Sequence, residues 1–298
     1  MKNKRFTICI FTFIVLSISL QSIRICAQEM PADTSWKTSG DFGVNLSQIS
    51  LTNWAGGGQN STTVIGLFNY NFVYEKDNVK WNNVIQLGYG ETKVEGQSWR
   101  KTDDRLIFLS QLHHKSAIQQ VSYSGSVDFR TQFTVGKDYS NSSEPVISNF
   151  MAPAYLLTNL GFEYAPSDFF TVTFAPLGAR TIFVLDKNLS DVGAFGVTPG
   201  SSILFEGGMN LNALFKKDVF ENVLFQSRLN VFGAYTHLQT LVVMWESLLV
   251  MKVNKFINVT AALDVFYDEK VVVQRSDGTV GPSTQLRNLF ALGILYKF

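Results

Sequence analysis

The sequence is poor in cysteine, in charge and in long apolar runs. Its only two cysteines, Cys9 and Cys26, lie among the first 27 residues, so a chain that loses this segment has no disulfide, no thiol nucleophile and no cysteine-ligated metal. Charged residues make up only 16% of the chain, against the usual quarter. After residue 27 no apolar run approaches 18 residues, which excludes a transmembrane helix. Clustered Lys and Arg are also missing, which excludes a nucleic-acid surface.

The first residues predict a secretory signal. A basic start, MKNKR, precedes 15 mainly apolar residues, which are too few to span a bilayer comfortably. A small residue, Ala27, then offers a cleavage site. The residues before Cys26 are too large for a lipoprotein cysteine. We therefore expect a signal peptide over residues 1–27, cleaved near Ala27, and one domain over residues 28–298.

What the chain does contain is repeated alternation of large apolar residues with small or polar ones. A period of two is typical of a β-strand that is apolar on one face. The chain ends on such an alternation, LFALGILYKF, in which one row consists of Phe290, Leu292, Ile294, Tyr296 and Phe298. A closed sheet has no edge for this last strand to expose, so we expect the row to face lipid.

Twelve segments show this alternation, and each reaches the roughly 9–11 residues that a tilted strand needs to cross a bilayer. Ten or fourteen strands remain the alternatives. The predicted strands span residues 38–51, 62–75, 79–91, 104–113, 120–135, 153–165, 169–184, 202–215, 222–236, 242–253, 256–268 and 286–298.

The connections between the segments alternate in length. Long ones, such as GKDYSNSSEPVISNFM, follow odd-numbered segments, and short ones, such as KDN and APSD, follow even-numbered segments. One odd connection, around His237, is short. This segregation predicts an all-β fold, a transmembrane antiparallel up-and-down β-barrel of about 12 strands in a cell outer membrane. The short turns, the start of the domain and Phe298 are then expected on the periplasmic side.

Several stretches resemble, in their order and spacing, a family of Bacteroidota outer-membrane β-barrel proteins known by a domain-of-unknown-function label. The stretches are NWAGGGQNS, KTDDR, MAPAY, GVTPGS, MWESLLVMKVN, VFYDEKV and LGILYKF. The resemblance covers nearly the whole mature chain and implies the same fold and location, but no activity and no catalytic residue. The terminal strand ending at Phe298 also resembles the signal read by barrel-assembly machinery, which is therefore an expected partner beside membrane lipid.

One stretch, HHKS, invites comparison with a hydrolytic triad. His114 and Ser116 lie two residues apart and Asp128 follows on the next segment, in a spacing similar to that of an outer-membrane phospholipase. The predicted topology places His114 and Ser116 at a turn, with Asp128 too far along its strand at about 3.3 Å per residue. We therefore predict no enzyme activity, with lipid hydrolysis as the third and least favoured function.

Metal ligands are not gathered by the predicted strands. His113 and His114 point to opposite faces, and His237 lies at the other end of the barrel. We expect no metal and no cofactor. Four residues are interpreted as solvated loop acids rather than as a calcium site: Asp103, Asp104, Asp186 and Asp191.

Ionisable residues in the inward rows are more informative, because such groups inside a membrane protein usually pair or line a wet path. Counting from the turns, we expect Glu206, Glu246 and Asp264 at one height, and Arg228 about three residues lower. The inward rows predict a mixed-charge network in the middle of the lumen. Its candidate members are Arg105, Asp128, Arg130, Glu206, Arg228, Glu246 and Asp264.

Two functions follow from this network. The first is a non-enzymatic narrow channel or solute-binding barrel, in which the charges form a constriction for a small polar solute. The alternative is a structural or assembly partner of another envelope complex, in which the same charges plug the lumen. Trp54, in the glycine-rich loop NWAGGGQN, is expected to anchor that loop or to stack on a ligand.

Overall fold

In a computed structural model, the structure describes residues 35–50, 59–139, 141–274 and 279–297, and every statement below concerns these residues. The expected signal peptide, Trp54 and Phe298 lie outside them.

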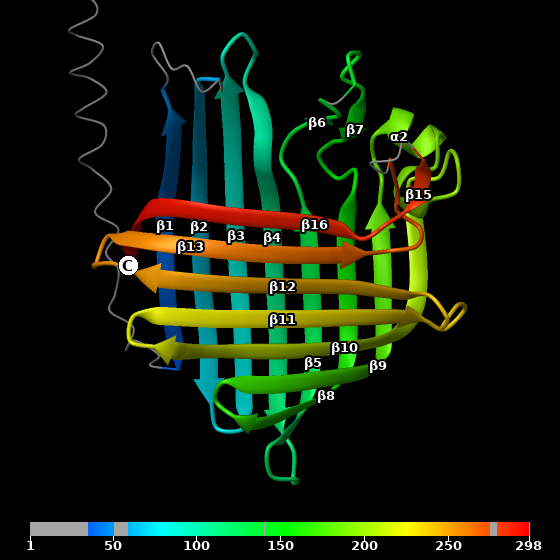
Figure 1. The fold of residues 1–298 in the computed structure, drawn as a ribbon. Helices are drawn as coiled ribbons and strands as arrows, with labels where there is room; N and C mark the ends of the chain where they lie inside the picture. Colours follow the sequence, from blue (N-terminus) through cyan, green and yellow to red (C-terminus); the bar gives the residue numbers. More distant parts are fainter. Residues whose placement is uncertain (1–34, 51–58, 140, 275–278, 298) are drawn as a thin grey trace, which may run out of the picture. The chain divides into compact units, whose positions relative to one another are not determined.

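Twelve antiparallel strands close into one barrel, which confirms the predicted fold and excludes ten or fourteen strands (Figure 1). Each predicted segment overlaps one of these strands. Their bounds are β1 (Trp36–Ile49), β2 (Ser61–Lys76), β3 (Val79–Val94), β4 (Arg100–Lys115), β5 (Val121–Thr131), β8 (Ala154–Ser167), β9 (Phe170–Phe183), β10 (Ile203–Phe220), β11 (Val223–Ala234), β12 (Leu241–Lys252), β13 (Ile257–Tyr267) and β16 (Gln285–Lys297).

The last strand closes the barrel by pairing with the first. β16 runs antiparallel to β1, with Asp41 opposite Lys297 and Asn45 opposite Gly293. In Figure 1 the strands β10 to β13 and β16 cross steeply over β1 to β5. This crossing is expected of a closed barrel, because its strands tilt from the barrel axis by about 35–45°.

Long and short connections lie at opposite ends of the barrel, as predicted. Only Asp77 and Asn78 separate β2 from β3. The connection around His237 is the expected exception, because it is short and lies at the end that carries the long connections. Which end faces the cell exterior stays a prediction. The long connections carry the remaining elements, which are β6 (Gly136–Lys137), β7 (Val146–Ser148), α2 (Lys187–Asp191), η1 (Ala194–Gly196), β14 (Val272–Gln274) and β15 (Val280–Pro282). No described helix is long and apolar enough to cross a bilayer.

The outer surface of the barrel is apolar, as the terminal alternation predicts. The side chains of Phe290, Leu292, Ile294 and Tyr296 are 77%, 59%, 62% and 60% exposed. Such exposure over a whole strand would be costly in water, at about 25 cal/mol per Å² of apolar area, whereas lipid accepts it without cost. The outward rows therefore form the lipid-facing surface of a transmembrane barrel.

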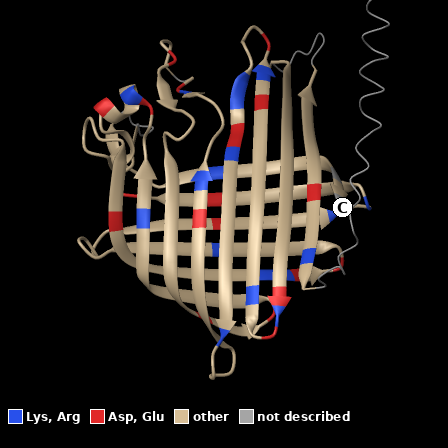
Figure 2. Cartoon of the chain, turned by 180° about the vertical axis from the view of Figure 1, so that it is seen from behind, with Lys and Arg blue, Asp and Glu red and all other residues tan. Residues whose placement is uncertain are grey.

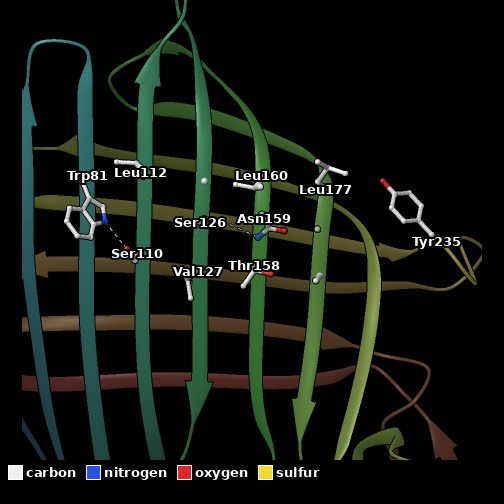
Figure 3. Close-up of a pocket in the computed structure, with 13 residues that line it drawn as sticks. Trp81, Ser110, Leu112, Ser126, Val127, Thr158, Asn159, Leu160, Leu177 and Tyr235 are labelled. Atoms are coloured by element: carbon white, nitrogen blue, oxygen red, sulfur yellow. Dashed lines mark hydrogen bonds between the residues drawn. The ribbon is translucent and has the colours of Figure 1, made fainter.

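A hollow of about 660 Å³ interrupts this surface over β4, β5, β8 and β9 (Figure 3). Exposed Leu160 and Leu177 border it, while Gly125 and Gly178 contribute no side chain to fill it. Because the side chains that border it are exposed on the outside of the barrel, the hollow belongs to the lipid-facing surface.

Polar groups beside this hollow satisfy one another. The indole Nε1 of Trp81 donates to Ser110 Oγ at 2.8 Å, and Ser110 donates to Asn83 Oδ1 at 2.7 Å. Lipid supplies no hydrogen-bond partner, so an outward polar group is tolerated only when a neighbour pairs with it.

Candidate functional site in the barrel lumen

Four charged residues form a row along one wall of the lumen. Arg228 on β11 lies opposite Glu246 on β12, Glu246 opposite Asp264 on β13, and Asp264 opposite Arg287 on β16. Because paired residues of neighbouring strands point to the same face, these four side chains share the lumen. Arg287 Nε lies 2.8 Å from Asp264 Oδ2.

The facing wall carries four more charges on two adjacent strands. Arg130 and Asp128 of β5 form a two-bonded ion pair, with 2.9 Å from Nε to Oδ1 and 3.0 Å from Nη2 to Oδ2. On β4, Arg105 Nη2 lies 3.4 Å from Asp103 Oδ2. Asp103 is only 6% exposed.

Two ion pairs join these walls across the lumen. Arg130 Nη1 lies 2.9 Å from Glu246 Oε1, and Arg287 Nη1 lies 3.3 Å from Asp103 Oδ1. Charged residues are sparse along most of the strand length (Figure 2). We call the eight residues the mid-lumen belt, whose four arginines balance four carboxylates: Asp103, Arg105, Asp128, Arg130, Arg228, Glu246, Asp264 and Arg287.

Arg228 differs from the other belt residues. Among the described residues it forms neither an ion pair nor a hydrogen bond through its side chain, although it lies opposite Glu246 in the strand register. Glu246 instead directs both carboxylate oxygens to Arg130, at 2.9 and 3.4 Å. The Arg228 guanidinium is therefore left with unused donors inside the lumen.

A second network lies nearer the long loops. Arg180 Nη1 lies 3.1 Å from Glu206 Oε2, and Arg180 also pairs with Asp268, while Lys270 pairs with Glu206. Arg180, Glu206 and Asp268 are 2%, 8% and 1% exposed. This network fixes the start of the β13–β16 connection to the inner wall of β9 and β10.

The expected heights of the charges were partly wrong. Glu206 does not lie level with Glu246 and Asp264, because the β10 residue opposite Arg228 is Leu214. Arg228 is in register with Glu246 rather than three residues lower. The cause is the stagger of barrel strands, which makes equal counts from the turns correspond to different heights.

Two of the expected loop acids are strand residues. Asp103 and Asp104 lie in β4, and Asp104 accepts hydrogen bonds from the Lys101 ammonium and from the backbone N–H groups of Phe133 and Thr134 at 2.7–3.0 Å. Interpreting them as solvated loop charges was therefore wrong. In the described part of the chain, no group of three or more His, Asp or Glu side chains is arranged to hold a metal ion.

A cavity of about 390 Å³ lies between the belt and the long loops. Arg105 and Arg130 belong both to its lining and to the belt. Phe195 of η1 and Val271 of the β13–β16 connection close it from the loop side. Its other lining residues are Asp104, Ile107, Thr131, Gln132, Pro153, Tyr155, Leu157, Arg180, Asn230, Phe232, Val242, Met244, Phe266 and Gln285.

The loop around η1 is held in the barrel mouth by an apolar core. Leu189 and Val197 pack with inward-facing Ile182 of β9, and Phe195 packs against the same cluster. Asp186 caps α2, accepting from Asn188 N and Leu189 N at 3.0 and 3.2 Å. The roof of the cavity is therefore an ordered part of the fold.

Besides Asp103, which was assigned to a loop, sequence reasoning missed four lumen residues: Arg180, Asp268, Lys270 and Arg287. Arg287 was detectable, because it shares its alternating row with Leu289, Ala291 and Gly293. Asp268 and Lys270 follow β13 in a connection without periodicity, where no pattern indicates direction.

The HHKS residues are not brought together with Asp128. Ser116 Oγ is held within its turn, donating to Val121 O at 2.8 Å and accepting from Ile118 N at 3.1 Å. Asp128 binds Arg130, and its register partner on β4 is Leu109, five residues before His114. The geometry needed for a nucleophile, a base and an orienting acid is not formed by these residues.

Residues 46–136 match the model of a family described as "Protein of unknown function (DUF3078)". This match confirms the expected resemblance to a family known by a domain-of-unknown-function label over these residues. Its extension over the rest of the chain and an origin in Bacteroidota stay predictions. A search of curated proteins gave no significant match.

Among solved structures, the chain is similar to the COG4313 outer membrane channel from Pseudomonas putida F1, with 11% identity, a TM-score of 0.41 and coverage of 88% of this chain and 95% of that one. It is also similar to the translocator domain of autotransporter NalP from Neisseria meningitidis, with 10% identity, a TM-score of 0.36 and coverage of 96% and 97%. A third is OmpT of Vibrio cholerae, with 8% identity, a TM-score of 0.32 and coverage of 88% and 97%. The first of these is described as an outer membrane channel and the third as an outer membrane protein.

Proposed function

We propose that this chain is a non-enzymatic outer-membrane barrel that binds and passes a small polar or charged solute, with the mid-lumen belt as its gate. In this proposal the signal peptide is cleaved near Ala27, and barrel-assembly machinery inserts the domain through its terminal strand. The observation that carries the gate is the ion pair between Arg130 and Glu246, which spans the lumen. A contact of 2.9 Å between the facing walls leaves no passage at that point.

The energetics of the belt suit a gate better than a fixed plug. Its charges are balanced, so opening would separate pairs without leaving a net charge in the membrane. The Glu246 side chain is 32% exposed to the lumen, where water screens it. The pair is partly buried, because the Arg130 side chain is only 14% exposed, so separating it costs less than the roughly 3–5 kcal/mol of a fully buried pair. A charged solute that replaces one partner offsets part of this cost.

Single-channel conductance in a planar bilayer tests this function. The purified protein is compared with Arg130→Met and Glu246→Gln, each of which removes one side of the pair. We expect small or rare openings for the unmodified protein and larger, more frequent openings for both variants. Lys187→Met, which removes an exposed ion pair on α2, is the control and leaves the conductance unchanged. Heat-modifiability on gels verifies that each variant is folded.

The second function, an envelope partner with a plugged lumen, is favoured by the number of contacts that close the lumen. Two pairs cross the belt, and the second network ties a loop to the inner wall. If folded Arg130→Met and Glu246→Gln barrels remain silent, the gate is excluded and cross-linking in whole cells should identify the partner instead.

A further inference from the structure

We propose that the 390 Å³ cavity between the belt and the long loops binds a small amphiphilic carboxylate, that is, one carboxylate on an aromatic or aliphatic body. This inference rests on the proposed solute-binding function and specifies the chemical class of the solute.

The walls of the cavity suit an apolar body. Ile107, Leu157, Phe232, Met244 and Phe266 come from five different strands and all line it. Its volume lies at the lower end of the roughly 300–1,000 Å³ of small-molecule sites, which are mostly apolar with a few placed polar groups. A fully polar solute would leave these side chains against unfavourable polar surface.

The charges that line the cavity are predominantly positive. Three arginines, Arg105, Arg130 and Arg180, face a single carboxylate, Asp104. Asp104 already accepts from Lys101 and from the backbone around Thr134, so it has little capacity left to repel or bind a ligand. Arg130 and Arg180 are paired with carboxylates of the protein, so the preference for an anion rests on Arg105.

Of the three arginines that line the cavity, Arg105 is the one least compensated by the protein. Arg130 and Arg180 are each hydrogen-bonded to two carboxylates, whereas the one ion pair of Arg105 among the described residues is a 3.4 Å contact to Asp103 that forms no hydrogen bond. Asp103 also shares its charge with Arg287. The guanidinium of Arg105 thus has donors available for a planar, two-bonded contact with a ligand carboxylate.

Gly88 helps to place Arg105 at the cavity. It lies opposite Arg105 in the β3–β4 register, and a Cβ atom there would come within 2.7 Å of Arg105 Nε. Without a side chain at this point, the Arg105 side chain can lie against β3 and present its guanidinium to the lumen.

Gln285 provides a second, independent indication of a ligand. Its Nε2 is buried and has no hydrogen-bond partner within the described structure, although the residue lines the cavity. A buried donor without an acceptor destabilises the fold, and such groups are rare in folded proteins. A turn of the Gln285 amide toward the cavity would let a ligand oxygen supply the missing acceptor. We therefore place the carboxylate at the belt side, near Arg105 and Gln285, and the apolar body toward Phe195 and Val271.

Isothermal titration calorimetry of the full barrel in detergent tests the inference with three probes. They are 3-phenylpropanoate, the uncharged 3-phenylpropan-1-ol, and acetate, which lacks the apolar body. We expect 3-phenylpropanoate to bind at least tenfold more tightly than either of the others. Equal binding of the alcohol would contradict the role of the arginines, and equal binding of acetate would contradict the role of the apolar walls.

Two variants then separate the site from general charge. Arg105→Met should weaken 3-phenylpropanoate binding by about 10–100-fold, as loss of a charged hydrogen bond predicts, and leave alcohol binding unchanged. Lys216→Met is the control, because it removes one positive charge from the inward row at the opposite end of β10. Equal losses in both variants, or no loss in Arg105→Met, would overturn the proposed site.

This test is independent of the gate. Binding that depends on Arg105 in a barrel that never conducts would support the site and contradict the channel. Conductance that responds to Arg130→Met without any binding of the probes would support the gate and contradict the site.

Discussion

Asp103 on β4 and Arg287 on β16 meet across the lumen, although 184 residues separate them in the chain. Oδ1 of Asp103 lies 3.3 Å from Arg287 Nη1, and its Oδ2 lies 3.4 Å from Arg105 Nη2. One nearly buried carboxylate thus joins two walls of the barrel and forms ion pairs with two arginines.

Asp103→Asn should lower the free energy of unfolding by about 1–2 kcal/mol. The loss is smaller than the 3–5 kcal/mol of a fully buried pair, because the Arg287 side chain is 41% exposed and water screens it. Urea unfolding from lipid vesicles, followed by tryptophan fluorescence, measures the change. Asp191→Asn, which breaks the exposed pair with Lys187, is the control and should cost less than about 0.5 kcal/mol. Equal stabilities of the two variants would contradict the structural role of Asp103.

A prediction about packing concerns Gly161 on β8. A Cβ atom at Gly161 would come within 2.1 Å of Phe174 O and 2.5 Å of Ala175 Cα, and neither backbone atom can move independently. Gly161→Ala should therefore destabilise the barrel by about 1–3 kcal/mol, as overpacking does.

Gly207→Ala is the matched substitution, because a Cβ atom at Gly207 meets nothing within 4 Å. Gly207 is likewise a strand residue, on β10, so this variant should leave stability unchanged or slightly raise it. The same unfolding assay compares the two variants. A Gly161→Ala barrel as stable as Gly207→Ala would show that β8 and β9 pack less closely than the structure indicates.

The loop above the cavity should respond to pH through Asp186. Its carboxylate accepts from the Asn149 side chain and from the backbone of α2, and these bonds hold its pKa below the usual value. A lowered pKa means that the charged form stabilises the fold above the unfolded pKa of about 3.9, and that this contribution is lost as pH falls through the folded pKa.

Hydrogen exchange of residues 184–202 measures this contribution. At pH 7, Asp186→Ala should exchange faster in this loop than the unmodified chain, because loss of an N-cap costs about 0.5–2 kcal/mol. After correction for intrinsic exchange, the difference should shrink below about pH 4. Asp191→Ala, at the last position of α2, tests whether any acid in the helix has the same effect. A difference that persists unchanged at acid pH would exclude the Asp186 carboxylate as the cause.

The strands were predictable because each one carries its own local pattern. The alternation that ends in Phe290, Leu292 and Ile294 needs no knowledge of the partner strand to be assigned an outward face. The belt could be predicted only in part, because its contacts depend on how distant strands are aligned and not on a local pattern. Arg130 and Glu246 are 116 residues apart, and their contact depends on strand stagger that no local count supplies.

Arg180 shows a second way in which local counting fails. Thr173 and Ala175 of β9 lie opposite Asn212 and Asn210 of β10, but a register shift then places Gly178 opposite Gly208 and Arg180 opposite Glu206. Between these pairs β9 advances by three residues, from Ala175 to Gly178, while β10 advances by only two, from Asn210 to Gly208. Strict alternation from Thr173 would turn Arg180 toward lipid, whereas this bulge turns it into the lumen. A side chain in a non-periodic loop, such as Phe195, carries no such pattern at all.

The assignment of inward and outward rows can be tested at one pair of adjacent residues. Leu211 and Asn212 lie in the middle of β10, with Leu211 40% exposed on the outer surface and Asn212 in the inward row with Asn210. Leu211→Arg would place a charge in lipid, which costs about 2–4 kcal/mol near the bilayer midplane. Asn212→Arg would place the same charge in the lumen, beside polar groups and water, and should cost much less. Unfolding from lipid vesicles compares the two variants, and unfolding from detergent micelles should reduce their difference. If both substitutions cost the same in vesicles, the outer surface of β10 does not contact the hydrocarbon core, and the membrane-spanning assignment of this wall is wrong.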